Sequence, residues 1–427
     1  MFVVRDQSGG PFDKWLDTRG IFKNREYLRS AYTPNELPHR KDQIDQLARI
    51  WAAPLRGETP SNVFVYGKTG TGKTATVKHL MSELRKTSKD FSSAIEVVYI
   101  NCEVINTKYR ILANVANKLR ETMQKRDPDY PKVSEHVPKT GWPTDQVYDA
   151  LLETLDSVKQ VVVMVLDEID RLVVRGVDDV LYDLTCINSE LRNSRTGIVG
   201  ISNDLDFVSQ LDPRIISRLG EEKVIFPPYD AFQLEDILTE RAEMSFCDGV
   251  ISDAAIRLCA AHAARKHGDA RRALDLLRCS GEIAEEDSAG RVTRDHVERA
   301  SERLERDMKE DAIRALPEQS KLVLLSILLL QEQRVPNIGT RDVYNVYRSL
   351  CRQNKSDILT MRRISGLISD LDMMGILEAQ TVSRGRYGRR KEVELTVEPV
   401  RARAAIEDDI YIKNLDSFSD TRQSKLG

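Results

Sequence analysis

The sequence predicts an α/β core built on a parallel sheet, then an all-α region, and a C-terminal domain of three helices and a β-hairpin. Three observations lead to this prediction. A glycine-rich stretch near residue 67 joins an apolar strand to a helix, residues 230–301 carry almost only helical patterns, and a strand–turn–strand pattern near residue 390 follows three helical stretches. Strands that alternate with helices are typical of a doubly wound parallel sheet with right-handed crossovers.

Composition limits the class of protein. A chain of 427 residues predicts two or three domains, and 41 % hydrophobic with 31 % charged residues is typical of a charge-rich globular protein. The net charge of −3 excludes a uniformly basic surface but not a local basic patch. The sequence has no run of 18 apolar residues and no signal peptide, and its six cysteines form no CxxC pair. We therefore expect a cytoplasmic protein with no membrane partner and no structural metal.

The strongest motif is GKTGTGKT, Gly67–Thr74, which fits G-x-x-x-x-G-K-[ST], the P-loop pattern. A predicted strand, Asn62–Tyr66, precedes it and an amphipathic helix follows. Backbone N–H groups of such a loop surround phosphate oxygens, and the helix adds its positive N-terminal end. We expect Lys73 to reach the β- and γ-phosphates and Thr74 to ligate Mg²⁺. The predicted cofactor-binding residues here are Gly67, Lys68, Thr69, Gly70, Thr71, Gly72, Lys73, Thr74 and Ala75.

A second motif ends a continuous apolar run, Val161–Leu166, which is typical of a central parallel strand buried on both faces. Asp167 follows it directly and is expected to hold Mg²⁺, mostly through water, while Glu168 would orient and polarise the attacking water. Asn203 ends another predicted strand, so its amide would reach the γ-phosphate or the lytic water; an Asx turn is the alternative. The two further strands expected in this sheet are Ala94–Asn101 and Thr196–Asn203.

Six stretches in the same order along the chain carry a family resemblance: YTPNELPHRKDQI, GKTGTGKT, LDEID, GISNDLDF, LDPRIISRLGEEKVIFPPYDAFQLEDILTERAE and GDARRALDLLR. Together they resemble the AAA+ superfamily, and more specifically the archaeal origin-recognition-type (ORC/Cdc-type) DNA replication initiators. The second and third stretches are generic to NTPases, whereas the last two are much more specific. The resemblance spans almost the whole chain. It implies a P-loop NTPase core of the AAA+ type, an α-helical lid and a C-terminal winged-helix domain, with ATP or ADP and Mg²⁺ as ligands.

The resemblance also implies roles for single residues. Asn203 matches a polar sensor, and Arg271 matches a second sensor on the lid that touches the γ-phosphate. Arg218 matches an arginine finger that acts on a neighbour's nucleotide, and Arg214, one helical turn away, is the alternative. Tyr229 and Arg241 match positions that line the nucleotide pocket, and His39 and Arg40 match a segment that passes over the adenine. The predicted catalytic residues are Lys73, Asp167, Glu168, Asn203, Arg218 and Arg271.

Helical patterns and the resemblance together set the expected domains. These are an AAA+ core over residues 1–228, a helical lid over 229–305, a winged-helix domain over 306–405 and a polar tail over 406–427. Ser252 and Asp253 before one lid helix, and Thr293 before another, are predicted helix N-caps.

The stretch SRGRYGRRKE, residues 383–392, is the predicted tip of the wing, with five cations in ten residues. In a winged helix the third helix enters the major groove, and the hairpin follows the neighbouring backbone or minor groove. A solvated hairpin tip is the alternative. In the resembled family an insertion in the core also touches DNA, for which Lys132, Lys139 and Trp142 are candidates; an ordinary surface loop is the other interpretation. The predicted DNA-binding residues are Arg362, Arg363, Arg384, Arg386, Tyr387, Arg389, Arg390 and Lys391.

We therefore expect a slow ATPase that uses hydrolysis as a switch, binds double-stranded origin DNA and helps to recruit the replicative helicase. Self-association on DNA and a chromosome-associated location follow from the same resemblance. Two other functions stay open: an AAA+ remodelling ATPase, and a winged-helix transcription regulator whose nucleotide is structural. The presence of Lys73, Asp167 and Glu168 disfavours a purely structural nucleotide.

Overall fold

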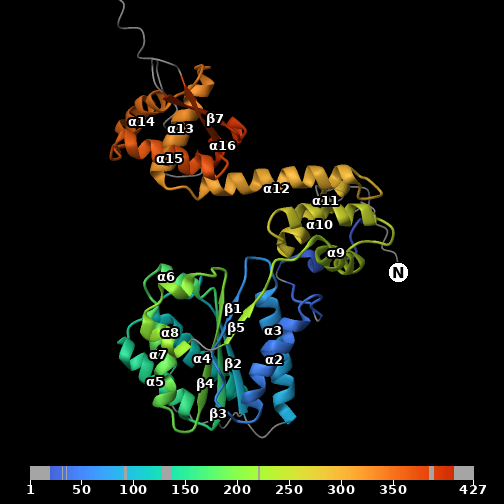
Figure 1. Cartoon of the computed structure of the whole chain (residues 1–427), viewed down its shortest axis with the longest axis vertical. Coiled ribbons are helices and arrows are strands. Elements are labelled where there is room, and N and C mark those ends of the chain that lie inside the picture. Colours follow the sequence, from blue (N-terminus) through green and yellow to red (C-terminus); the bar gives the residue numbers. More distant parts are fainter. Residues whose placement is uncertain are drawn as a thin grey trace, which may run out of the picture. The chain divides into compact units, whose positions relative to one another are not determined.

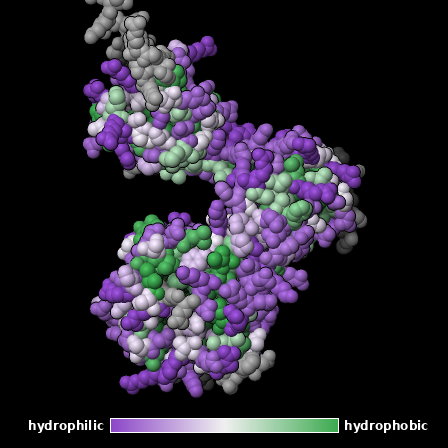
Figure 2. All heavy atoms as spheres, in the orientation of Figure 1, coloured by the Kyte–Doolittle hydropathy of each residue, from purple (hydrophilic) through white to green (hydrophobic). Residues whose placement is uncertain are grey.

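A computed structural model describes residues 20–30, 32–34, 36–90, 94–126, 136–219, 222–383 and 389–407. The chain divides into two compact units, Met1–Val297 and Glu298–Gly427, and each is described by itself. The division falls within the long helix α12, Arg294–Arg314, whose surface in Figure 2 is mostly hydrophilic, as expected from its many charged residues. Across the described ranges, no helix combines the length and the apolar character needed to span a bilayer.

The N-terminal unit is built on a five-stranded parallel sheet of order β2-β3-β4-β1-β5. The predicted parallel sheet is thereby confirmed. Its central strand β3 is buried at every position, as its apolar run predicts. The edge strand β5 was not predicted from the sequence, because only Val224 of its four residues is buried and no apolar run marks it. The strands are β1 Val63–Tyr66, β2 Ala94–Asn101, β3 Gln160–Asp167, β4 Arg195–Ser202 and β5 Glu222–Ile225.

Helices cover both faces of this sheet (Figure 1). Buried side chains of the sheet and of these helices form a separate apolar core on each face. On one face lie α2, Lys41–Leu55, and α3, Lys73–Thr87, which follows the P-loop directly. On the other face lie α4 Lys108–Arg126, α5 Thr144–Asp156, α6 Asp170–Val174, α7 Asp179–Cys186 and α8 Pro213–Leu219. This two-sided cover leaves the carboxyl ends of the strands, where the P-loop and Asp167 lie, as the edge at which a ligand binds.

Side chains satisfy backbone carbonyls along both edge strands of the sheet. At β2, Arg85 of α3 donates to the Val97 carbonyl at 2.6 Å, and Lys118 of α4 donates to the Tyr99 carbonyl at 2.6 Å. At β5, two glutamines of α2 act in the same way, Gln43 on Ile225 at 3.5 Å and Gln46 on Lys223 at 3.3 Å. These acceptors therefore have partners, although no other strand of the described residues pairs with either edge.

The lid consists of α9 Ala231–Ser245, α10 Asp253–Arg265, α11 Ala270–Glu286 and the start of α12. Asp230 forms a capping box with Gln233 at α9. The predicted N-cap at Ser252 is confirmed, because its hydroxyl accepts from the Ala255 N–H at 3.3 Å. Thr293 immediately precedes α12, so that helix begins where the sequence predicts. At α11, Asp269 caps the helix and lies against the P-loop.

The C-terminal unit contains α13 Glu318–Glu332, α14 Thr340–Asn354, α15 Met361–Met373 and an antiparallel hairpin of β6 Leu377–Ser383 and β7 Arg389–Leu395. The prediction of three helices followed by a hairpin is confirmed. Helix α13 is buried at every position from 320 to 330, so it forms the centre of this domain. A last helix, α16 Pro399–Glu407, was not predicted; it begins at a proline, as helices often do, and contacts α13.

Arg40 connects the P-loop to the segment that enters the lid. Its side chain is 1 % exposed and donates to the carbonyls of Thr71 at 2.9 Å, Pro227 at 2.8 Å and His39 at 3.0 Å. The guanidinium carbon also lies 3.7 Å from the ring centroid of Tyr229. Burial lowers the pKa of Arg40, and its described neighbours stabilise the cation through carbonyl oxygens and an aromatic face.

We expect the Arg40→Met variant to lower the free energy of unfolding of the N-terminal unit by about 2–4 kcal/mol, because two inter-segment carbonyls would lose their buried donor. Arg40→Lys should restore only part of this loss, since an ammonium lacks the planar fork. Denaturant unfolding measures the effect. The matched control is Arg56→Met, which removes an exposed arginine paired with Glu58; an equal loss in both variants would contradict the assigned contact.

Candidate functional site

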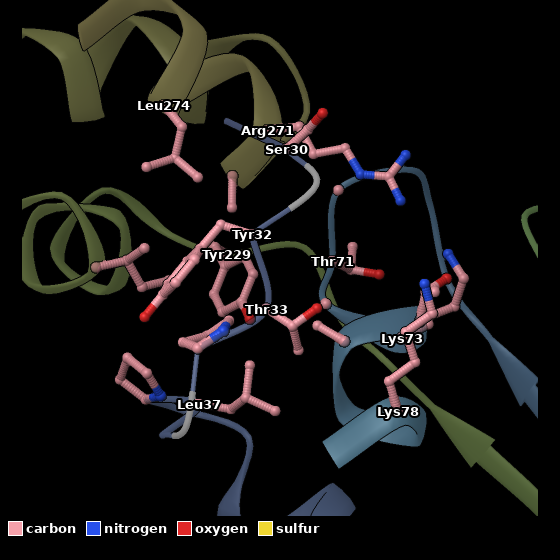
Figure 3. A pocket seen from close by; sticks show the side chains of 18 of the residues that line it. Ser30, Tyr32, Thr33, Leu37, Thr71, Lys73, Lys78, Tyr229, Arg271 and Leu274 are labelled. Carbon is pink, nitrogen blue, oxygen red and sulfur yellow. The ribbon is translucent and has the colours of Figure 1, made fainter. Parts of the chain in front are cut away.

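A cavity lies between the P-loop, the lid and residues 29–30, 32–34 and 36–38 (Figure 3). Its two ends differ in chemistry. Tyr32, Leu37, Tyr229 and Leu274 gather on one side of the view, whereas Thr71, Lys73, Lys78 and Arg271 gather on the other. An apolar end beside a cationic end fits a ligand with a flat ring system and several negative charges.

Two glycines of the P-loop permit the lid to approach closely. Gly70 has φ +74°, and a Cβ atom there would lie 1.7 Å from a carboxylate oxygen of Asp269. Gly72 has φ +86°, and its Cβ would lie 2.8 Å from the Tyr229 hydroxyl. The Ala270 N–H at the start of α11 also donates to the Gly70 carbonyl at 3.1 Å. A side chain at either glycine would therefore be strained and would push the lid away from the loop.

Lys73 lies at the cationic end and is held by three acceptors. Its ammonium donates to the carbonyls of Gly67 at 2.7 Å and Lys68 at 2.8 Å, and to Asn203 Oδ1 at 2.8 Å. Burial lowers the pKa of Lys73 to about 8, against the opposing effect of Asp167. Lys73 and Asn203, each predicted separately, thus come together in the cavity.

Asp167 receives hydrogen bonds on both carboxylate oxygens. Its Oδ2 accepts from the Thr74 hydroxyl at 2.9 Å and from the Tyr99 hydroxyl at 2.6 Å, while its Oδ1 accepts from the Glu168 N–H at 3.0 Å. A hydroxyl and a carboxylate are oxygen donors that suit Mg²⁺. The described residues offer no cluster of three His, Cys, Asp or Glu ligands, so water and ligand phosphates would complete the coordination. Thus Thr74 and Asp167 fit the ion.

Glu168 lines the same cavity and has an unusual backbone, with φ +56°. Its carboxylate lies 3.8 Å from Arg171, which is also 4.0 Å from Glu103. Burial, with the nearby Glu103 carboxylate, raises the pKa of Glu168. A carboxylate with a raised pKa beside the phosphate end suits general-base chemistry on water.

The lid contributes two arginines to the cavity wall, Arg241 and Arg271. Arg241 is 6 % exposed, its guanidinium carbon lies 4.5 Å from the Tyr32 ring centroid, and its Nη1 has no hydrogen-bond partner in the described part of the chain. Arg271 is exposed and follows the capping residue Asp269, which accepts from its N–H at 2.8 Å. Both arginines therefore have donors available to a ligand at this wall.

Two residues expected near the adenine do not line the cavity. His39 Nε2 lies within hydrogen-bond distance of Asp236 Oδ2, at 2.8 Å, and Arg40 is directed to the carbonyls described above. Their neighbours Leu37 and Pro38 line the cavity instead. The signal that could have found these residues is the apolar and aromatic content of the stretch YTPNELPHR, which suits a base rather than phosphates. Tyr99 was also missed, although it lies two positions before the end of β2 on the strand beside Asp167.

The two arginine-finger candidates of α8 lie outside the cavity. Arg214 forms a two-pronged ion pair with Asp212, at 2.7 Å at its closest. Arg218 is exposed. The guanidinium carbons of Arg214 and Arg218 each lie 5.5 Å from the ring centroid of Tyr182. Arg218 is therefore the more available of the two for a neighbouring molecule.

In the C-terminal unit, Arg362 and Arg363 are exposed on the first turn of α15. Lys391 of β7 donates to the Ser369 hydroxyl of α15 at 2.7 Å, so it connects the wing to this helix. The predicted residues Arg384, Arg386 and Tyr387, and the side chains of Arg389 and Arg390, lie outside the described residues.

The proposed core insertion is described only in part. Trp142 packs partly buried against the apolar core, Lys139 is exposed, and Lys132 is outside the described residues. Trp142 therefore contributes to packing. Of the two described candidates for DNA contact, Lys139 is the one with an exposed side chain.

Three family models match successive parts of the chain. The AAA ATPase domain matches residues 36–182, the Cdc6 AAA+ ATPase-type lid domain residues 235–302, and the CDC6 C-terminal winged helix domain residues 311–405. The matches follow the order core, lid and winged helix that the structure has.

Curated relatives match over almost the full length. The ORC1-type DNA replication protein of Thermococcus onnurineus is 50% identical over 415 residues, 97% of this chain and 98% of that protein. The ORC1-type DNA replication protein 1 of Methanosarcina mazei is 51% identical over 427 residues, covering 99% and 100%. The solved structure of Aeropyrum pernix ORC1 in complex with DNA is 42% identical with a TM-score of 0.75, covering 92% of this chain and 98% of that one. The chain therefore belongs to the family of ORC1-type DNA replication proteins, initiators with an AAA+ ATPase core, a Cdc6-type lid and a winged helix.

Proposed function

We propose that this chain is an ATP-controlled initiator that binds double-stranded origin DNA and helps to recruit the replicative helicase, at the chromosome. The observation that carries the proposal is the two-ended cavity between the P-loop and the lid. Its aromatic and aliphatic end suits adenine, and its end with Lys73 and Arg271 suits a triphosphate. The relative from Aeropyrum pernix, solved in complex with DNA, supports the DNA-binding part.

Each polar residue of the cavity has one task in this proposal. Lys73 and Arg271 would bind the terminal phosphates, and Asn203 would orient Lys73 or the attacking water. Glu168 would accept the proton of that water. Thr74 and Asp167 would hold Mg²⁺, which supplies charge neutralisation on the phosphates when it is bound. Turnover by a single copy would be slow, because Arg218 is absent from its own cavity and must act from a neighbour.

The contact between P-loop and lid gives hydrolysis a way to act as a switch. Asp269 and Ala270 of the lid contact Gly70, and Tyr229 fills the space beside Gly72. Nucleotide in the loop therefore touches the elements that hold the lid. A ligand that binds both the loop and Arg271 would favour the closed arrangement, and loss of the γ-phosphate would weaken it.

DNA binding would use α15 and the wing. Arg362 and Arg363 are exposed on the first turn of α15, the helix that would enter the major groove. The hydrogen bond between Lys391 and Ser369 orients the hairpin relative to that helix. Self-association on DNA would bring Arg218 of one copy to the nucleotide of the next.

The main rival is a winged-helix transcription regulator with a structural nucleotide. A test that separates the two is genome-wide mapping of bound sites beside mapping of replication start sites in the same cells. The initiator should be enriched at the start sites, and depletion of the chain should reduce firing there. Binding confined to promoters, with start sites unchanged after depletion, would contradict the proposal. The other rival, a remodelling ATPase, would instead show fast turnover stimulated by DNA.

ATP affinity should depend on pH through Lys73. Its pKa in the free protein is lowered to about 8, and the triphosphate favours the ammonium form. Binding above that pH therefore requires proton uptake, so affinity is full below it and lost as pH rises. We expect the Kd for ATP to increase by up to about tenfold per pH unit above pH 8, measured by calorimetry. Lys73→Arg, whose charge does not titrate, is the control, and a wild-type profile as flat as that of this variant would refute the role.

Duplex binding should lose affinity and salt dependence when Arg362 and Arg363 are replaced by Ala. If each neutralises one phosphate, the log–log salt slope should become shallower by about 2 in the double variant. Fluorescence anisotropy of a labelled duplex over a salt series measures this. Arg401→Ala removes an exposed cation of the same domain that pairs with Glu310 at 2.8 Å, and should leave the slope unchanged. Equal slopes for all three proteins would exclude α15 from the DNA interface.

A further inference from the structure

The Asp167 carboxylate has a donor that does not belong to the P-loop or to its own strand. Tyr99 lies on β2, beside β3, and the register pairs it with Val165, two residues before Asp167. Its hydroxyl reaches forward and donates to Asp167 Oδ2 at 2.6 Å. The Thr74 hydroxyl donates to the same oxygen at 2.9 Å. Asp167 is 4 % exposed, so these donors, with the Glu168 N–H, determine how the carboxylate is oriented.

Two lysines outside β2 contact Tyr99, one at its backbone and one at its ring. Lys118 donates to the Tyr99 carbonyl at 2.6 Å, which fixes the backbone at the free edge of the sheet. The Lys78 ammonium, which lines the nucleotide cavity, lies 4.8 Å from the ring centroid.

We propose that Tyr99 is a positioning residue for the divalent cation: its hydroxyl holds Asp167 so that the carboxylate and the Thr74 hydroxyl face a bound Mg²⁺ together. The proposal rests on the function given above, since it requires a magnesium nucleotide in this cavity. Without Tyr99, Oδ1 would keep the Glu168 N–H, and Oδ2 would keep only the Thr74 hydroxyl, which is itself a proposed Mg²⁺ ligand. Tyr99 adds a second fixed donor on the same oxygen, from a different strand. Donors to a ligating carboxylate change metal affinity without touching the metal.

The alternative is that Tyr99 only stabilises the edge of the sheet. The two interpretations differ in what Tyr99→Phe changes. The ring and its packing stay, and only one hydrogen bond is lost. If the role is structural, thermal stability changes and the Mg²⁺ requirement does not. If Tyr99 positions Asp167, the Mg²⁺ requirement changes, whereas nucleotide binding without metal stays close to that of the wild type.

The chain offers a matched control in the same unit. The Tyr148 hydroxyl donates to the Glu190 carboxylate at 2.6 Å, as the Tyr99 hydroxyl does to Asp167. Neither Tyr148 nor Glu190 lines the cavity. Tyr148→Phe therefore removes a tyrosine–carboxylate hydrogen bond of equal length that lies away from the nucleotide.

The experiment measures binding of a fluorescent N-methylanthraniloyl ATP by wild type, Tyr99→Phe and Tyr148→Phe, first in EDTA and then across a Mg²⁺ titration, with melting temperatures recorded. We expect the Mg²⁺ midpoint of Tyr99→Phe to rise about tenfold, with its metal-free Kd within about twofold of wild type. Tyr148→Phe should match the wild type in both. A Mn²⁺ titration followed by electron paramagnetic resonance gives a second readout of the metal itself.

The outcomes separate the two proposals. If the wild type binds the probe with a clear Mg²⁺ dependence and Tyr99→Phe has the same midpoint, the positioning role is wrong and the nucleotide function stands. If the wild type shows no Mg²⁺-dependent binding, the proposed function is wrong and the role of Tyr99 falls with it. A shift of equal size in Tyr148→Phe would mean that the effect is structural, which also overturns the proposal.

Discussion

The contact between the P-loop and the lid is the constraint on which the rest of the N-terminal unit depends. Gly70 and Gly72 leave room for Asp269 and Tyr229, and both glycines have backbone angles that other residues rarely adopt. Arg40 stabilises this contact because it donates both to the Thr71 carbonyl of the loop and to the Pro227 carbonyl of the segment that enters the lid. Because these links join core and lid, residues of both line one cavity. The first turn of α11 contacts the P-loop directly, through the hydrogen bond from the Ala270 N–H to the Gly70 carbonyl.

Four of the predicted site residues form two hydrogen-bonded pairs at the same loop. Lys73 donates a hydrogen bond to Asn203, and Thr74 donates one to Asp167. A phosphate group or metal ion bound as proposed would therefore meet side chains that are already oriented by each other. Such pre-organisation reduces the cost of ordering side chains when a nucleotide arrives. It also explains why second contacts, such as that of Tyr99, have consequences beyond local packing.

The sequence predicted the parallel sheet, the helical lid and the winged helix because these elements have local patterns: apolar runs, helical spacing and a glycine loop. It did not predict β5, whose four residues have one buried side chain, nor the role of Tyr99, which depends on a neighbour 68 positions away. Arg40 was placed over the adenine by resemblance. Its side chain is directed to backbone carbonyls instead, because a buried guanidinium requires acceptors that only the folded loop and linker supply.

The side chains that donate to the outer carbonyls of β2 and β5 have a consequence at high protein concentration. Strand edges with unpaired backbone groups favour pairing with a strand of another chain, most of all at high local concentration. With Arg85 and Lys118 at one margin and Gln43 and Gln46 at the other, those carbonyls are already engaged. An edge whose carbonyls are engaged in this way is a weaker template for pairing with a strand of another chain.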